Sequence, residues 1–234
     1  MNKTFKAAVA AAALAIVPAA NATQFDVQIT NLTNAIYYTP FLAGAHPAGT
    51  SLFTVGQPAS PEIQAMAEGG DIAGLVTILD SIGGTVVANP AGGLLAPTES
   101  TTFSMDTDGT ANTLLTIVAM LLPTNDAFAG LNSIEIPTEP GTYVYDVPAY
   151  DAGTEANDEL LTGGGAPGAP GMPADPGGLT GTGGMGAAMA DTNTTVHIHR
   201  GALGDTNATG GASDLDSRIH RWLNPVVRVT ITVQ

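Results

Sequence analysis

The chain of 234 residues contains no cysteine, so it can form neither a disulfide nor a thiolate metal site. Iron–sulfur clusters, cysteine-based zinc sites and cysteine nucleophiles are therefore excluded. An exported protein without disulfides must rely on its apolar core or on a bound metal for stability. Aromatic residues are scarce at 5%, while Gly, Ala, Thr, Val and Pro are abundant, which favours short strands and turns over a helical bundle.

Basic residues are also scarce, with 6 Lys and Arg against 21 Asp and Glu. The only two lysines are Lys3 and Lys6, so removal of residues 1–22 would leave four arginines against 21 acids, a net charge of −17. Such a surface disfavours nucleic acids and anionic membranes as partners, and it attracts cations.

The chain also lacks a long apolar run. Residues 7–17 are apolar, but about 11 residues are too few to span a bilayer as a helix, which needs about 20. Two lysines precede this run and Ala-Asn-Ala follows it at residues 20–22, which indicates a secretory signal cleaved after Ala22. We therefore expect a secreted or periplasmic protein whose mature chain is residues 23–234. An uncleaved anchor is the alternative.

Eight segments alternate apolar and polar residues or are continuously apolar, as β-strands are. They are residues 25–30, 36–42, 100–105, 114–122, 133–136, 142–147, 194–199 and 226–233. The segment at 114–122 is nearly all apolar, which predicts a central strand buried on both faces. The long connections favour Greek-key returns over simple hairpins. We therefore predict a single all-β domain over residues 23–234, an antiparallel β-sandwich of about eight strands.

Two departures from the strand pattern are expected. A small helical insertion is predicted at about residues 60–83, because Ser60 and Asp71 each suit a helix start and a glycine pair follows each helical pattern. Residues 161–192 are dominated by Gly, Pro, Ala and Thr. That composition is too poor in large apolar side chains to bury a core, so it predicts a long surface loop.

Two loops carry side chains that suit a hard cation. Residues 150–159 contain four carboxylates and no Lys or Arg, and carboxylates this close repel one another unless they face water or bind a cation. Asp151 and Glu155 can both contact one ion across the intervening Gly-Thr, and Asp126, from the loop at 123–130, would complete the set. Ca²⁺ takes 6–8 oxygen ligands, so carbonyls and water would supply the rest. A solvated acidic loop is the alternative.

The strand at 194–199 places Val196 and Ile198 on one face and His197 and His199 on the other. The two histidines would form half of a transition-metal site if His220 or an acid supplied a third ligand. The alternative is a pair of surface histidines that face a polar loop. The sequence contains no G-x-S-x-G, H-E-x-x-H or phosphate-binding motif, so nothing in it points to a catalytic set.

Four motifs follow one another in the order found in the spondin domain. They are Val-Gly-Gln-Pro-Ala-Ser-Pro at 55–61, Pro-Thr-Asn-Asp at 123–126 with Gly130 and Leu131, Asp-Ala-Gly-Thr-Glu at 151–155, and Val-Val-Arg-Val-Thr-Ile at 226–231. The chain therefore resembles the spondin domain, which forms the spondin-N region of the matrix proteins F-spondin and mindin and also occurs in secreted bacterial proteins. The resemblance covers most of residues 24–160 and then 194–234, and its most specific part is the Asp-Ala-Gly-Thr-acid motif.

The resemblance implies a C2-like β-sandwich with a Ca²⁺ site at one end, and it places Asp126, Asp151 and Glu155 at the calcium-binding positions. Two departures bear on this site. Glu155 stands where the animal proteins have Asp, and the longer side chain would shift or weaken the site. Ala127 stands where the family has an aromatic residue, and the family's disulfides are absent.

These observations together lead us to expect a secreted calcium-binding module that is not an enzyme. It would mediate adhesion or interaction with the extracellular matrix. Its partner would be an extracellular polysaccharide, a surface protein or another copy of the chain. The alternative is a metal-dependent extracellular or periplasmic hydrolase that uses the same acidic end of the sandwich. Fold alone does not separate the two, because one fold can carry many functions.

Overall fold

The computed structural model describes residues 24–188 and 190–234. The signal sequence and the cleavage expected after Ala22 lie outside the described residues. Within them, regular structure comprises β1 (Gln24–Asn31), β2 (Tyr37–Tyr38), β3 (Leu42–His46), α1 (Pro61–Gly69), α2 (Ala73–Ser81), β4 (Thr85–Ala88), β5 (Ser100–Asp106), β6 (Leu114–Leu122), β7 (Ala127–Glu135), β8 (Gly141–Val147), β9 (Ala149–Asp151), β10 (His197–Ile198) and β11 (Val227–Val233).

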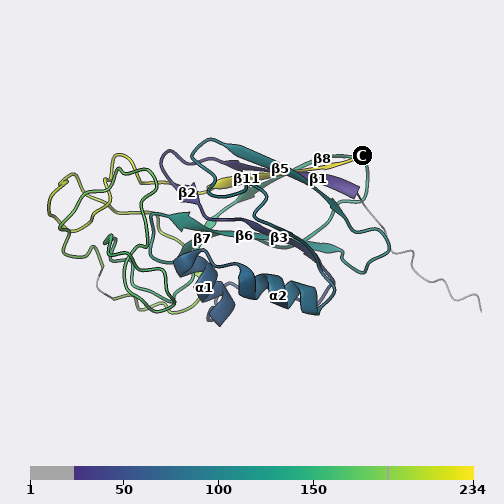
Figure 1. Ribbon diagram of the computed structural model, residues 1–234, viewed down its shortest axis with the longest axis horizontal. Helices are drawn as coiled ribbons and strands as arrows, with labels where there is room; N and C mark the ends of the chain where they lie inside the picture. The colour runs from purple at the N-terminus through teal and green to yellow at the C-terminus, as the bar shows by residue number, and fades with distance from the viewer. Residues whose placement is uncertain (1–23, 189) are drawn as a thin grey trace, which may run out of the picture.

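The strands form two sheets that pack face to face (Figure 1). The smaller sheet has the order β5-β1-β11-β8, and the larger has the order β10-β9-β7-β6-β3-β4 with β2 paired to β6. The strand pairs are antiparallel. The all-β antiparallel sandwich that the sequence predicts is therefore confirmed.

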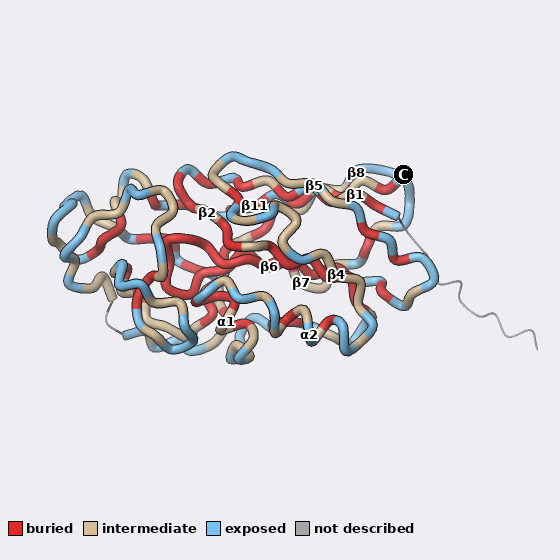
Figure 2. The backbone as a smooth tube through the Cα atoms, viewed as in Figure 1, coloured by how far each residue is buried: buried red, intermediate tan, exposed pale blue. Residues whose placement is uncertain are grey.

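The main core lies between the inner faces of the two sheets (Figure 2). Alternate residues of β1 and β11 point into it, as the period of two in their sequences predicts. Val27 is paired with Ile231 and Ile29 with Val229, and all four side chains are fully buried. The last strand of the chain thus lies beside the first described one and carries its apolar face to the centre of the molecule.

Strand β6 is buried on both faces, as its nearly continuous apolar sequence predicts. Leu115 and Leu121 pack between the sheets, whereas Val118 and Met120 pack on the opposite face. Helices α1 and α2 cover this second face (Figure 1). Both helices lie within the insertion predicted at about residues 60–83.

Local interactions determine where α1 begins and ends and how closely α2 packs on β3. The Ser60 side chain accepts a hydrogen bond from the backbone N–H of Ile63, and Gly70 ends α1 in the left-handed conformation. Helix α2 approaches strand β3 closely because Gly44 has no side chain. A Cβ atom at Gly44 would lie only 2.3 Å from Leu79 Cδ1.

Several strand boundaries differ from the prediction. The strand expected at 36–42 is divided into β2 and β3, with Pro40 between them, because proline has no N–H to donate to a ladder. Strands β4 and β9 were not predicted, since four and three residues are too few to show a period. Strand β7 begins at Ala127, so the loop expected at 123–130 is only four residues long.

The described residues between 161 and 192 form no helix or strand, in agreement with the predicted loop. The expectation that this segment buries no core was wrong, because Met172 is fully buried and belongs to the main core cluster. We call residues 158–217, apart from β10 and residue 189, the loop lobe. It lies at the end of the sandwich opposite the C-terminus (Figure 1).

Candidate metal-binding site

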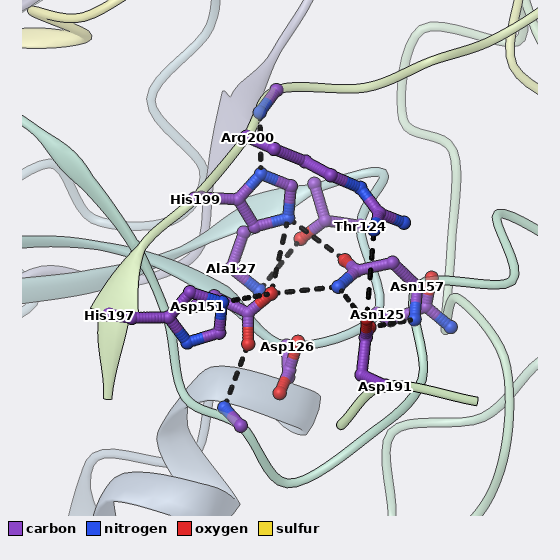
Figure 3. A network of polar contacts seen from close by, with 12 residues as sticks. Thr124, Asn125, Asp126, Ala127, Asp151, Asn157, Asp191, His197, His199 and Arg200 are labelled. Atoms are coloured by element: carbon purple, nitrogen blue, oxygen red, sulfur yellow. Dashed lines mark hydrogen bonds and ion pairs between the residues drawn. The ribbon is translucent and has the colours of Figure 1, made fainter. Parts of the chain in front are cut away.

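The three predicted ligands lie on neighbouring segments at the lobe end of the larger sheet, and Figure 3 shows two of them, Asp126 and Asp151. Asp126 directly precedes β7, and Asp151 is the last residue of β9. Strands β7 and β9 pair with Ala127 opposite Asp151, which places the two aspartates side by side. Glu155 follows in the turn after β9, and its backbone N–H donates to Asp126 Oδ2 at 3.1 Å. Strand pairing thus unites loops that lie about 25 residues apart in the sequence.

Asp126 is fully buried, and one of its oxygens lies in a cradle of donors. Its Oδ2 accepts hydrogen bonds from the N–H of Thr154 at 2.9 Å and from the hydroxyl of Thr154 at 3.2 Å, besides that from Glu155. Its Oδ1 is buried and has no partner. Burial, and next the charge of Asp151, raise the pKa of Asp126 to about 7. A cation beside Oδ1 would relieve both effects.

Asp151 is also buried, but its two oxygens are both engaged. Oδ1 accepts from the N–H of Gly153 at 2.8 Å, and Oδ2 accepts from the Asn157 side chain at 2.7 Å. The Nε2 atoms of His197 and His199 lie 3.8 and 4.0 Å from the same Oδ2 (Figure 3). Within the Asp-Ala-Gly-Thr-Glu turn, the carboxylate of Asp151 therefore accepts a hydrogen bond from the backbone of the same turn.

Glu155 has one engaged and one free oxygen. Its Oε1 accepts from the Asn125 side chain at 2.8 Å and from the N–H of Gly171, whereas its buried Oε2 has no partner. The pKa of Glu155 is raised, first by burial and then by the charges of Glu68 and Asp158. Two of the three predicted ligands thus each present an unpartnered buried carboxylate oxygen.

This donor set fits a hard cation such as Ca²⁺, since an unpartnered buried carboxylate oxygen is costly unless a proton or a metal satisfies it. The side chains do not yet form a ligand shell. Within residues 24–188 and 190–234, no three His, Asp or Glu side chains converge in an arrangement that could hold a metal ion. A cation that used all three predicted residues would therefore require their carboxylates to reorient. The Ca²⁺ site remains a prediction.

The histidine pair differs from both sequence interpretations. His199 is buried rather than on the surface, and its ring lies 5.2 Å from that of Trp222. His199 Nδ1 accepts from the N–H of Gly201 at 2.9 Å, so the proton of the neutral ring must be on Nε2, which contacts Asn157 Oδ1 at 2.9 Å. Burial lowers the pKa of His199 to about 4. Its Nε2 has no lone pair for a metal in this arrangement, which argues against a transition-metal site.

The other expectations for this strand are corrected as well. Ile198 is 51% exposed, so it does not share the buried environment of Val196, because β10 is only two residues long and lies at the edge of the sheet. His220 does not join the pair in a hydrogen bond. Its Nδ1 accepts from the N–H of Asp216 at 3.0 Å, and its buried Nε2 has no partner.

Two residues of this network were missed in the sequence. Asn157 donates to Asp151 Oδ2 and, at 2.9 Å, to Asp191 Oδ2 (Figure 3). As a carboxamide within the acidic stretch, Asn157 could have been recognised as a donor placed between carboxylates. Asp191 lies in the Gly/Pro-rich segment, 34 residues further on, and no local pattern marks it.

A protein-family model, Spondin_N, matches residues 21–160. This match includes the segments around Asp126, Asp151 and Glu155, and it ends before most of the loop lobe and before β11. No curated protein matches the chain significantly. Neither helix in the described part of the chain is long and apolar enough to cross a membrane. The chain belongs to the Spondin_N family, the spondin N-terminal domain, a domain type of extracellular adhesion and matrix proteins.

Proposed function

We propose that this protein is a calcium-binding adhesion module that acts outside the cell or in the periplasm and is not an enzyme. The observation that carries the calcium assignment is the pair of buried, unpartnered oxygens, Asp126 Oδ1 and Glu155 Oε2. Both belong to loops that the family match covers. Ca²⁺ would neutralise the carboxylates gathered here, and the chain's own groups would orient them.

The surrounding residues have distinct parts in this proposal. The N–H groups of Thr154 and Glu155 hold Oδ2 of Asp126, so the free Oδ1 is left for the cation. Asn125 holds Oε1 of Glu155 in the same way and leaves Oε2 free. Asn157 and Gly153 fix Asp151 at the base of the turn. These are neutral donors, so they orient the carboxylates without removing the need for a cation.

The burial of the acids favours a binding module over a hydrolase. Asp126 and Asp151 are 0% and 2% exposed, so a substrate has no direct access to either carboxylate. A catalytic acid or base must come within hydrogen-bond reach of the group on which it acts. The cation would therefore stabilise this end of the sandwich, and the partner would contact the surface around it. An extracellular polysaccharide or a surface protein suits a module of this kind.

Calcium titration by calorimetry tests this proposal. We expect wild-type protein to bind Ca²⁺ and, at a free concentration about 100 times Kd, to gain about 2.7 kcal/mol of stability, which raises Tm by about 5–10 °C. Asp126→Asn should weaken binding at least about tenfold, because it removes the charge beside the free oxygen. The matched control is Asp108→Asn, which removes the same charge from an exposed turn and should bind as wild type does.

Absence of both heat and stabilisation in the wild-type protein would contradict the calcium assignment. The partner is then sought on immobilised extracellular polysaccharides, with Ca²⁺ and with chelator. Release of the protein from such a surface by chelator would support a calcium-dependent module. Breakdown of the polysaccharide, lost in Asp126→Asn, would instead support the hydrolase.

A further inference from the structure

One part of the Gly/Pro-rich segment forms a closed strap, which we define as residues 163–172. Two backbone hydrogen bonds close its base, from the N–H of Met172 to Leu160 O at 2.8 Å and from the N–H of Gly163 to Met172 O at 3.2 Å. The side chain of Met172 is fully buried in the main core. The strap lies beyond the end of the family match at residue 160. Its base is thus anchored, and its tip is free to make other contacts.

The tip of the strap rests on the end of helix α1. Glu68, in the last turn of α1, is fully buried, and its Oε2 accepts from the N–H of Gly168 at 2.6 Å. The backbones of α1 and the strap approach each other closely beside Glu68. A Cβ atom at Gly69 would lie 2.1 Å from Gly165 O. The other oxygen of Glu68 accepts from the Gln64 side chain at 2.9 Å. A buried carboxylate with two donors joins the strap to the helical insertion.

The strap also contacts the candidate cation site. The N–H of Gly171 donates to Glu155 Oε1, the same oxygen that the Asn125 side chain holds. Glu155 Oε2 is left buried and without a partner. The strap and Asn125 therefore together satisfy Oε1 of Glu155 and leave Oε2 available.

We propose that the strap is a positioning element of the cation site: it holds Glu155 with Oε2 free for the cation, and the bound cation in turn holds the strap against the sandwich. This inference rests on the proposed calcium binding. The physical basis of the coupling is charge. The N–H groups of the strap connect two carboxylates, since Gly168 donates to Glu68 and Gly171 donates to Glu155, and like charges gathered in a partly buried space repel one another. A cation at Oε2 reverses that repulsion, so strap docking and cation binding favour each other.

Gly171→Ala tests the positioning role. Gly171 has φ of +97°, and a Cβ atom there would lie 2.0 Å from Thr162 Oγ1, which donates to Pro170 O of the strap, and 3.0 Å from Leu160 O, so alanine should disturb the strap at its contact with Glu155. The matched control is Gly178→Ala, where φ is +64° and no atom lies within 4 Å of the added Cβ. Both variants carry the backbone strain of a left-handed alanine, but only the first moves the donor to Glu155.

We expect Gly171→Ala to weaken Ca²⁺ binding about tenfold, the usual effect of losing one hydrogen bond to a charged group. Gly178→Ala should bind Ca²⁺ as wild type does. Circular dichroism should show the same sheet content in both. If Gly171→Ala fails to fold, Glu68→Gln replaces it, since this change keeps the side-chain size and removes the charge that joins the strap to α1. It should raise amide exchange of Gly168 in the calcium-bound protein.

Hydrogen exchange with and without Ca²⁺ provides the second readout. In the wild-type protein, Ca²⁺ should slow amide exchange over residues 163–172 more than over β11. The strap inference is overturned if wild type binds Ca²⁺ while the exchange of these residues is unchanged and Gly171→Ala binds equally tightly. If wild type binds no Ca²⁺ at all, the proposed function fails first and this inference falls with it, so the two failures can be told apart.

Discussion

The four-stranded sheet and the loop lobe must both satisfy backbone N–H groups, and they do so with different partners. In the sheet, β1 pairs along its length with β5 on one side and β11 on the other. Its inward side chains are fully buried, so ladder hydrogen bonds and apolar burial act together. The lobe as defined has no strand ladder, and its backbone N–H groups donate partly to isolated backbone carbonyls and partly to carboxylates.

Several lobe carboxylates accept from two or more donors, and three of them, Glu159, Asp214 and Asp205, hold mainly backbone N–H groups. Glu159 accepts from the N–H groups of Leu203 and Gly204 and from the Ser213 hydroxyl. Asp214 accepts from the N–H groups of Leu161 and Gly184. Asp205 accepts from the N–H groups of Asn207, Ala212 and Ser213. Hydrogen bonds to ionised acceptors are about twice as strong as neutral ones. An acidic, glycine-rich segment can thus keep a defined conformation with little apolar burial, and its order should depend on charge.

The largest effect should come from the core of the sheet. Ile231→Ala removes a fully buried side chain that β11 contributes to the main core, and such changes cost about 2–5 kcal/mol. Urea unfolding followed by circular dichroism measures the loss. Thr230→Ala, one residue away on the outer face, is the control and should change stability by less than about 0.5 kcal/mol. Equal losses in the two variants would contradict the assignment of β11 faces.

A smaller, local effect is expected in the lobe. Glu159→Gln replaces one of the two acceptor oxygens with an NH₂ group that faces the N–H of either Leu203 or Gly204, and a buried unsatisfied donor costs about 1–3 kcal/mol. Amide exchange should rise at these two residues and stay unchanged in β11. Glu139→Gln, on an exposed turn, controls for the loss of one charge. Uniform destabilisation of the sheet and the lobe would show that the two regions unfold as one unit.

The smallest effect should appear on acidification. Hydrogen bonds from the N–H groups of Asn207, Ser213 and Ala212 lower the pKa of Asp205. A depressed folded-state pKa stabilises the lobe above the unfolded value of about 3.9, and that contribution is lost as pH falls through the folded-state pKa. Exchange around residues 205–213 should therefore rise below about pH 4 before exchange in β1 does. Asp205→Asn should remove this pH dependence, and its persistence would point to another acid.

Much of the sandwich could be predicted because its signals are local. The alternation of β11 reflects burial of one face of the strand, and the apolar run of β6 reflects burial of both faces. Both patterns can be read from the sequence of a single segment. The caps of α1 are equally local, since Ser60 and Gly70 act within one turn. The three candidate ligands were named from residue type and spacing, and strand pairing between β7 and β9 brings their loops together.

The rest depends on contacts between segments that no local pattern connects. The burial of His199 follows from its packing against Trp222 and from the short edge strand that carries it. The link between Asn157 and Asp191 joins residues 34 apart, and that between Glu68 and Gly168 joins residues 100 apart. A glycine-rich loop has no periodicity, so its sequence does not show which carboxylate will accept its N–H groups.

The sequence by itself therefore determined the fold class, the central strand, the helical insertion and the residue types of the acidic end, because side-chain period, capping and charge are written in neighbouring residues. Only the tertiary structure decided which carboxylate oxygens are satisfied and which are left free. That choice depends on donors such as Asn125, Gly171 and Thr154, which come from different loops and meet only when the two sheets and the lobe have packed.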